Sequence, residues 1–282
     1  MSIKPFSVDS QPAFPAKNQV QLVVADMDGT LLNADHKLSQ RTINTVQALV
    51  KQGTEFMLAT GRHYEDVRPM AKQLGVDACL ITSNGARIHD FQGQILHENH
   101  MPSHLVAAVL EVSRGFEVHR NLYQQDLWLV EEPHETLLAM HDQSGFRYRI
   151  TDFNSMHLSG VDKLYFTAAH DILVPLERAL LASFSEQLNI TFTSPEYLEV
   201  MNLGVSKGNA LLKLLAIKGK SAQYTVALGD GMNDVDMLSL VGFGVVMENA
   251  SDTVKRQLPN KLRAKSNAQE GVADFIERYL LA

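Results

Sequence analysis

Two aspartates separated by one residue follow an apolar run near the N-terminus. The run spans 22–25, and the sequence DMDGTL (26–31) comes directly after it. Such a run, bounded by a glycine, predicts a buried strand of a parallel sheet, and ligands bind at the carboxyl ends of strands in open α/β sheets. A divalent cation and a phosphate would suit two carboxylates there: oxygen ligands for the metal, one group to attack phosphorus and one to move a proton. The alternative is a solvated Asp-Gly turn.

A second acidic loop stands near the C-terminus, in LGDGMND (228–234). It also follows an apolar strand pattern and opens a predicted helix. Asp230 and Asp234 could serve as metal ligand and support, and Asn233 as a neutral donor to phosphate. Asp234 could instead be only an acid in the first turn, interacting with the helix dipole.

Two further segments suit a bound phosphate. In LATGR (58–62), the hydroxyl of Thr60 and the backbone exposed at Gly61 stand where a strand meets a helix, and can hold a phosphate oxygen. Lys207 opens a predicted helix, where the dipole disfavours a cation, so a bound anion explains it better than helix stability does. The alternative for the first segment is a plain turn. The polar loop TSNGA (82–86) reads equally well as a simple hairpin entry.

The composition limits the class of protein. The chain has 282 residues, is 45% hydrophobic and carries a formal net charge of −7, which argues against nucleic acid or an acidic membrane as the main partner. No apolar stretch approaches the ~20 residues that a membrane helix needs. A single cysteine, Cys79, cannot form an internal disulfide and suits a reducing cytoplasm. The 11 histidines show no spacing typical of a zinc site.

The elements that must position these residues alternate between strand and helix in two separated segments, 19–90 and 191–282. This alternation predicts an α/β fold with a doubly wound parallel sheet. Between them, residues 91–190 predict an inserted α+β domain, and residues 1–18 a flexible N-terminal extension.

In the two outer segments we expect strands at 22–25, 55–59, 78–82, 224–228 and 243–246, and helices between 39 and 53 and at 63–74, 205–217, 232–240 and 271–281. In and beside the inserted domain we expect a hairpin at 87–97, helices at 103–114 and 173–187 with another between the strands, and strands at 117–123, 127–131, 163–168 and 190–193.

Four motifs, DMDGTLL, ATGR, VSKG and GDGMND, occur in an order and at intervals that resemble the haloacid dehalogenase (HAD) superfamily of phosphatases. The resemblance covers the chain from about Val20. The inserted segment resembles the α/β cap of the Cof-type subfamily. The resemblance therefore implies a Rossmann-like HAD core with an inserted cap domain.

The resemblance also implies roles for the acidic residues. Asp26 would be the nucleophile, forming an aspartyl phosphate, and Asp28 the general acid and then the base. Mg²⁺ would be held by the carboxylates of Asp26 and Asp230 and by the backbone carbonyl of Asp28. Asp234 would hold these ligands in place without binding the ion itself. The groups expected to bind the phosphoryl oxygens are the backbone of Met27, Thr60, Gly61, Lys207 and Asn233.

The function expected from this resemblance is Mg²⁺-dependent hydrolysis of small cytoplasmic phosphomonoesters. Stretches such as ATGRHYEDV and ITSNGARIHD resemble family members that act on pyridoxal phosphate and sugar phosphates. Two alternatives remain: a phosphotransferase or mutase that uses the same intermediate, and a phosphate-binding regulatory module without turnover, against which the intact Asp26 and Asp28 argue. Tyr123 and Trp128 could face a pyridine ring or belong to the core of the cap.

Overall fold

The computed structural model describes residues 19–281, which form two compact units. The described residues of unit 1 are 19–56 and 215–281, and unit 2 is Met57–Leu214. The extension predicted for residues 1–18 lies outside the described residues. In the part of the chain described, no helix has both the length and the apolar character to cross a bilayer.

Unit 1 contains a parallel sheet whose strands, apart from the edge strand, are buried on both faces. Its strands are β1 (Leu22–Ala25), β12 (Thr225–Gly229), β13 (Phe243–Met247) and β14 (Leu262–Ala264), in the order β14-β13-β12-β1. Ala25 is paired with Leu228, and the N–H of Asp26 donates to the Leu228 carbonyl at 3.0 Å. Each acidic loop follows a strand, as the sequence predicts, and the structure shows that the two strands are neighbours, so both loops leave the sheet at the same end.

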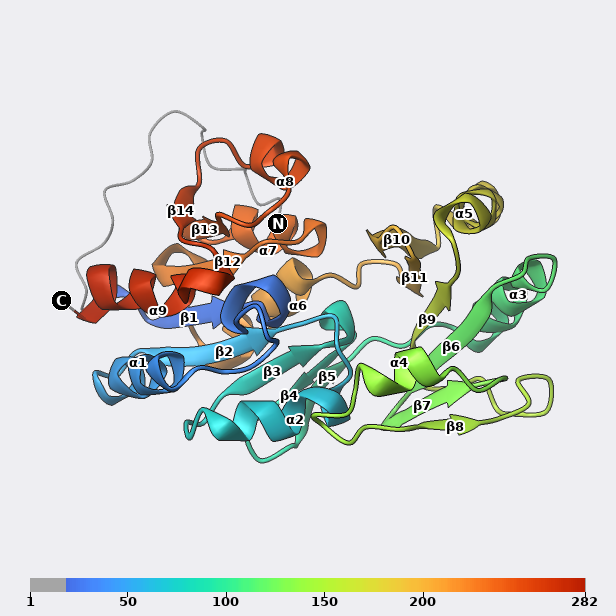
Figure 1. The fold of residues 1–282 in the computed structure, drawn as a ribbon, viewed down its shortest axis with the longest axis horizontal. Helices are drawn as coiled ribbons and strands as arrows, with labels where there is room; N and C mark the ends of the chain where they lie inside the picture. The colour runs from blue at the N-terminus through green and yellow to red at the C-terminus, as the bar shows by residue number, and fades with distance from the viewer. Residues whose placement is uncertain (1–18, 282) are drawn as a thin grey trace. The chain divides into compact units, whose positions relative to one another are not determined.

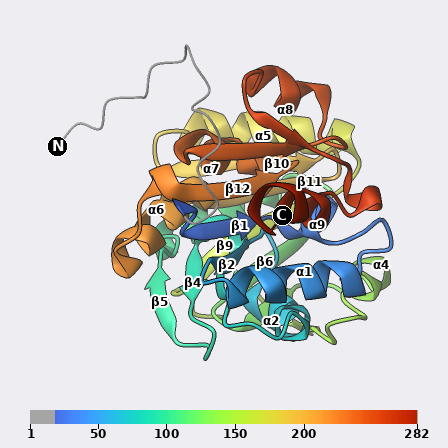
Figure 2. The same cartoon turned by 90° about the vertical axis from the view of Figure 1, so that its left-hand side faces the viewer.

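The helices of unit 1 are short. They are α1 (Gln40–Lys51), α7 (Val235–Leu240), α8 (Asp252–Gln257) and α9 (Gly271–Ile276), with helical turns η2 (Met27–Leu31), η4 (Ala222–Tyr224), η5 (Met232–Asp234), η6 (Asn267–Gln269) and η7 (Glu277–Leu281). Ser39 caps α1, because its Oγ accepts a hydrogen bond from the Thr42 N–H at 3.1 Å. Figure 2 shows α1 beside α9, and α7 packs against β12 and β13.

Strand β2 (Glu55–Ala59) begins in unit 1 and ends in unit 2, where it pairs in parallel with β3 (Cys79–Thr82). The hairpin of β4 (Arg87–His89) and β5 (Ile95–Glu98) continues this sheet with antiparallel pairing. Helix α2 (Tyr64–Gln73) follows β2, the turn η3 (Ser83–Gly85) follows β3, and α6 (Lys207–Lys218) begins in unit 2. Cys79 is buried.

A second sheet in unit 2 has six strands, in the order β10-β11-β9-β6-β7-β8. The strands are β6 (His119–Gln124), β7 (Leu127–Val130), β8 (Tyr148–Ile150), β9 (Val161–Thr167), β10 (Leu188–Ser194) and β11 (Tyr197–Asn202). Neighbours are antiparallel except for the parallel pair β7 and β8. The helices around this sheet are α3 (Ser103–Ser113), α4 (Glu135–Ala139) and α5 (His170–Phe184).

The two faces of the six-stranded sheet carry different cores, because side chains alternate along a strand. Leu122, Leu164 and Phe166 belong to a core made mainly of leucine and valine, together with residues of α3 and α5, and these two helices lie next to each other (Figure 1). Tyr123, Trp128 and Tyr165 belong to an aromatic cluster on the other face, with residues of α4 and the segment after it. Both Tyr123 and Trp128 are buried in this cluster, which agrees with the interpretation that they belong to the core rather than face a ligand.

The expected α/β class is confirmed, and the hairpin of β4 and β5 adds antiparallel pairing to the parallel sheet that was expected. Each helix and strand expected from the sequence is present, with its ends shifted by a few residues. The sequence reading missed β8, β11, β14 and α8. Strands β8 and β14 have three residues each, which is too short for a periodic signal. Strand β11 is covered on both faces and carries the buried Glu199, so it shows no clean alternation of polar and apolar residues.

Candidate active site

Three carboxylates meet at the edge of the parallel sheet in unit 1. Asp26 follows β1, Asp230 follows β12 and Asp234 lies in η5, and one oxygen from each falls within 4.8 Å of the others. Asp26 and Asp234 are buried, and Asp230 is half-buried. Carboxylates this close repel one another unless a cation lies between them. The donor set, all hard oxygen, fits Mg²⁺ and does not fit a soft metal.

Neighbouring side chains fix the carboxylate of Asp230. The Thr30 hydroxyl donates to its Oδ1 at 2.8 Å, and Asn249 Nδ2 donates to its Oδ2 at 3.3 Å and to the Gly29 carbonyl at 2.8 Å. Thr30 stands within the first acidic motif, but the sequence analysis gave it no role. Asn249 lies after β13, with no motif around it. The first acidic loop and the loop after β13 thus jointly orient a carboxylate of the second acidic loop.

Asp234 organises the backbone of its own loop. Its Oδ2 accepts hydrogen bonds from the N–H groups of Asp230 at 3.1 Å and Gly231 at 2.9 Å. A Cβ added to Gly229 would overlap the Asp234 side chain, so the close approach requires glycine there. The geometry suits the supporting role expected for Asp234, and its carboxylate also lies near enough to share an ion with the other two. Asn233 is half-buried in the same turn.

Asp28 lies in a more open environment than Asp26. Its side chain is 40% exposed, and its Oδ1 lies 3.6 Å from Nδ1 of His36, a residue that the sequence analysis did not single out. Met27, between the two aspartates, buries its side chain and begins the turn η2, where its carbonyl accepts from the Leu32 N–H at 2.9 Å. Asp26 precedes this turn and is buried, whereas Asp28 lies within the turn and is partly exposed.

The loops after β2 and β3 in unit 2 are tied together by backbone hydrogen bonds. The Asn84 N–H donates to the Thr60 carbonyl at 3.0 Å, and the Ser83 N–H donates to the Arg62 carbonyl at 2.8 Å. Thr60 is buried, and its Oγ1 accepts from the Arg62 N–H at 3.1 Å. Since the hydroxyl accepts this bond, its hydrogen can be donated to another oxygen.

Lys207 is the first residue of α6, as the sequence predicts, and only 1% of it is exposed. A lysine at a helix N-terminus faces the positive end of the dipole, and its burial adds a desolvation cost. Both costs fall when an anion is bound nearby. Gly61 and Lys207 belong to unit 2, with Thr60, while the acidic cluster belongs to unit 1.

Comparison with known proteins matches residues 23–276 to the family model of haloacid dehalogenase-like hydrolases. A Haemophilus influenzae protein is 37% identical over 257 residues, covering 90% of this chain and 94% of the relative. A Yersinia pseudotuberculosis protein named HMP-PP phosphatase is 36% identical over 260 residues, covering 92% of this chain and 95% of the relative. The crystal structure of a haloacid dehalogenase-like hydrolase from Bacteroides thetaiotaomicron aligns with a TM-score of 0.82 at 28% identity, covering 92% of this chain and 98% of that one.

The chain belongs to the haloacid dehalogenase-like hydrolase family. The resemblance found in the four motifs is thereby confirmed, as is the HAD fold. The protein is a hydrolase of this family, and its acidic cluster contains the first aspartate of the first motif and both aspartates of the last.

Proposed function

We propose that this protein is a Mg²⁺-dependent phosphomonoester hydrolase of small metabolites that works through an aspartyl phosphate on Asp26. The cluster of Asp26, Asp230 and Asp234 carries the proposal, because it brings three hard oxygen ligands together beside two neighbouring parallel strands. Membership of a hydrolase family and similarity to a named phosphatase support it.

Asp26 and Asp28 would carry the chemistry. The Asp26 carboxylate attacks phosphorus, forming an O–P bond as the bond to the leaving alcohol breaks, and Asp28 gives its proton to the leaving oxygen. Asp28 then takes a proton from a water molecule, whose oxygen attacks phosphorus, displaces Asp26 and releases orthophosphate. The partial exposure of Asp28 suits this role, because it must exchange a proton twice in each turnover.

Asp26, Asp230 and the backbone carbonyl of Asp28 would hold Mg²⁺, with Asp234 fixing the loop that carries Asp230. Bound there, the ion would offset negative charge on the phosphoryl group. The Thr60 hydroxyl, the Lys207 ammonium and the Asn233 amide would bind the phosphoryl oxygens, together with the backbone of Met27 and Gly61. Fixed donors of this kind stabilise charge as it develops during phosphoryl transfer.

Residues 91–190 would act as a cap that sets which leaving group fits. We propose pyridoxal phosphate and sugar phosphates as substrates, on the motif resemblance, and HMP-PP as a further candidate, on the relatives that carry that name. These are small anions, and a cytoplasmic location fits them. The net charge of −7 agrees with substrates held by local donors rather than with nucleic acid or membrane partners.

The test is orthophosphate release from a panel of these compounds by wild-type protein and the Asp26→Asn variant. The amide is a far poorer nucleophile, so kcat should fall by roughly 10³-fold or more while the melting temperature and circular dichroism stay near wild type. More than about one per cent residual kcat would remove Asp26 from the nucleophile role. Phosphate transfer to an added sugar in place of water would make the protein a phosphotransferase. Phosphate binding without turnover would make it a regulatory module.

A further inference from the structure

Unit 2 contains a buried cation, Lys163, that the proposed mechanism does not use. Lys163 lies on β9, and only 3% of it is exposed. Its ammonium donates to Glu199 Oε1 at 2.6 Å and to the Gly61 carbonyl at 3.0 Å. It also lies 5.0 Å from the ring centroid of Tyr123 and 5.4 Å from that of Tyr165. A strand of the six-stranded sheet thus reaches the backbone of the proposed phosphate loop.

Glu199 extends this contact to the next loop. It is buried on β11, the strand beside β9, and its Oε2 accepts from Asn84 Nδ2 at 2.6 Å. Asn84 has a positive φ of 56°, a conformation that costs energy for a residue with a side chain. The Lys163–Glu199 pair therefore connects the loop after β2 with a strained residue in the loop after β3.

The contact at Gly61 bears directly on Thr60. The peptide group between Gly61 and Arg62 has its carbonyl bound to the Lys163 ammonium, and its N–H donates to Thr60 Oγ1 at 3.1 Å. Because a peptide group is planar, the direction of the carbonyl fixes the direction of the N–H. The N–H in turn occupies an acceptor site of the hydroxyl, which sets where the hydroxyl hydrogen can point.

We propose that Lys163, paired with Glu199, is a positioning residue that aims the Thr60 hydroxyl at the transferring phosphoryl group. It touches no substrate and acts through the Gly61–Arg62 peptide. The inference rests on the proposed function, because Thr60 and Gly61 have the role of phosphate ligands there. A buried ion pair contributes little net stability compared with apolar residues of similar size, so stability alone does not account for this one.

The test removes the contact without leaving a lone buried charge. In the double variant Lys163→Met with Glu199→Gln, the methionine fills the space of the lysine stem, and the glutamine carbonyl can still accept from Asn84. The single variant Lys163→Met is measured beside it. Because the double variant has no charge at position 199, a loss of activity that both variants share is not caused by an unpaired Glu199.

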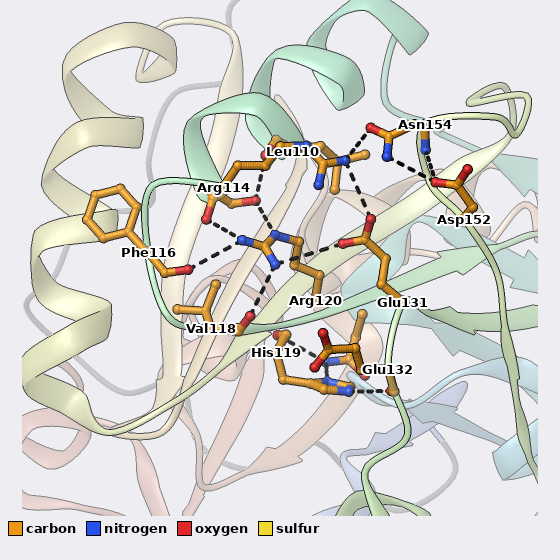
Figure 3. Close-up of polar contacts among 12 residues, drawn as sticks. Leu110, Arg114, Phe116, Val118, His119, Arg120, Glu131, Glu132, Asp152 and Asn154 are labelled. Carbon is orange, nitrogen blue, oxygen red and sulfur yellow. Dashed lines mark hydrogen bonds and ion pairs between the residues drawn. The ribbon is translucent and has the colours of Figure 1, made fainter.

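Arg120→Met is the matched control, because Arg120 holds backbone carbonyls of the same sheet region without contacting a phosphate motif. It donates to the Ser113 carbonyl at 2.6 Å and the Phe116 carbonyl at 3.3 Å, and it lies 3.8 Å from Glu131 (Figure 3). Glu131 keeps a second partner in Arg114, at 3.4 Å, after the substitution. The control therefore removes a comparable cation from unit 2.

Three quantities are measured: kcat/KM for two substrates with different leaving groups, the affinity for orthophosphate in Mg²⁺, and amide hydrogen exchange at Arg62. In both Lys163 variants kcat/KM should fall by about tenfold to a hundredfold, by the same factor for both substrates. Orthophosphate should bind about tenfold more weakly, and the Arg62 amide should exchange faster. Arg120→Met should lower the melting temperature while changing kcat/KM by less than about twofold.

The proposal is overturned if the double variant keeps wild-type kcat/KM and wild-type exchange at Arg62, whatever its melting temperature. A loss that differs between the two substrates would also overturn it, since that would assign Lys163 to the leaving group. If the wild-type protein hydrolyses no phosphomonoester, the proposed function fails separately. Exchange at Arg62 and orthophosphate binding, which need no turnover, then decide the role of Lys163.

Discussion

Gly29 illustrates how one residue controls the geometry of the acidic cluster. Its φ is +77°, a region that residues with a Cβ adopt at a cost. A Cβ there would also overlap the carboxylate of Asp230, which Thr30 and Asn249 hold in place. Two separate reasons, backbone conformation and contact with the proposed metal ligand Asp230, therefore require glycine at this position.

Gly29→Ala should weaken Mg²⁺ binding and lower kcat/KM by about tenfold or more, because the new methyl group displaces Asp230. Gly53→Ala is the matched control: Gly53 has φ +95°, but a Cβ there would meet no atom within 4 Å. Both variants should lose about 1–2 kcal/mol of stability from the positive φ. Calorimetric titration with Mg²⁺ separates them, and equal Mg²⁺ affinity in the two variants would contradict the packing argument.

Among the secondary-structure elements, helix α2 is capped at its N-terminus by His63, whose ring must be neutral to accept a hydrogen bond there. Nδ1 of His63 accepts from the Glu65 N–H at 3.1 Å, so Nε2 carries the hydrogen and donates to the Gln125 carbonyl at 2.7 Å. The ring is buried and stacks on Phe146 at 4.6 Å between centroids. Burial lowers the pKa of His63 from 6.5 to about 4. Protonation would remove the acceptor that caps the helix.

The free energy of unfolding should therefore fall as the pH drops from 6.5 towards 4. In that range His63 is protonated in the unfolded chain and neutral in the folded chain. This difference lowers the free energy of unfolding by up to about 3 kcal/mol at the lower pH limit. The variant His63→Asn keeps a capping side chain but cannot titrate, so its pH dependence should be shallower. Urea unfolding at pH 7.5 and 4.5 measures both slopes. His89, whose pKa burial also lowers to about 4, titrates in both proteins, so neither slope falls to zero. Identical slopes would show that His63 titrates normally.

The aromatic face of the six-stranded sheet depends on Trp128, which is 0% exposed and donates from Nε1 to Asn121 Oδ1 at 3.0 Å. Trp128→Ala should lower the free energy of unfolding by about 3–5 kcal/mol. Trp128→Phe keeps most of the packing and leaves the Asn121 oxygen unpaired, so it should lose about 1–3 kcal/mol. Urea unfolding measures both. Unequal changes in kcat/KM across the substrate panel, with stability unchanged, would instead place the ring at the substrate.

At the scale of the whole molecule, binding of Mg²⁺ should stabilise the folded chain. The three carboxylates come from segments about 200 residues apart, so they form an ion site only when the chain is folded. Mg²⁺ should raise the melting temperature and support activity, and EDTA should reverse both. Ca²⁺ should substitute poorly, since it prefers more ligands and longer bonds. Asp230→Asn is the control that should lose the Mg²⁺-dependent rise in melting temperature. Full activity in EDTA or in Ca²⁺ alone would argue against the proposed cofactor.

Local sequence patterns were sufficient to locate most strands, helices and acidic loops. The run 22–25 is apolar because both faces of β1 are buried, and it predicted a parallel strand before DMDGTL. Lys207 opens a helix, where the dipole disfavours a cation, and this position led to the prediction that it binds an anion. The structure shows that this lysine is buried at the start of α6. Signals of this kind lie within a few residues of the feature that they describe, so one sequence suffices to read them.

The side chains that contact the loops of the proposed site could be identified only from the tertiary structure. Asn249 reaches Gly29 across 220 positions, and Lys163 reaches Gly61 across 102. Neither contact leaves a periodic pattern in the chain, because it arises only when separate strands and loops are packed together. The sequence by itself determined which groups could do chemistry and which strands carry them. Only the tertiary structure decided which side chains hold those groups in place, because hydrogen bonds and packing act between atoms that are close in space rather than in sequence.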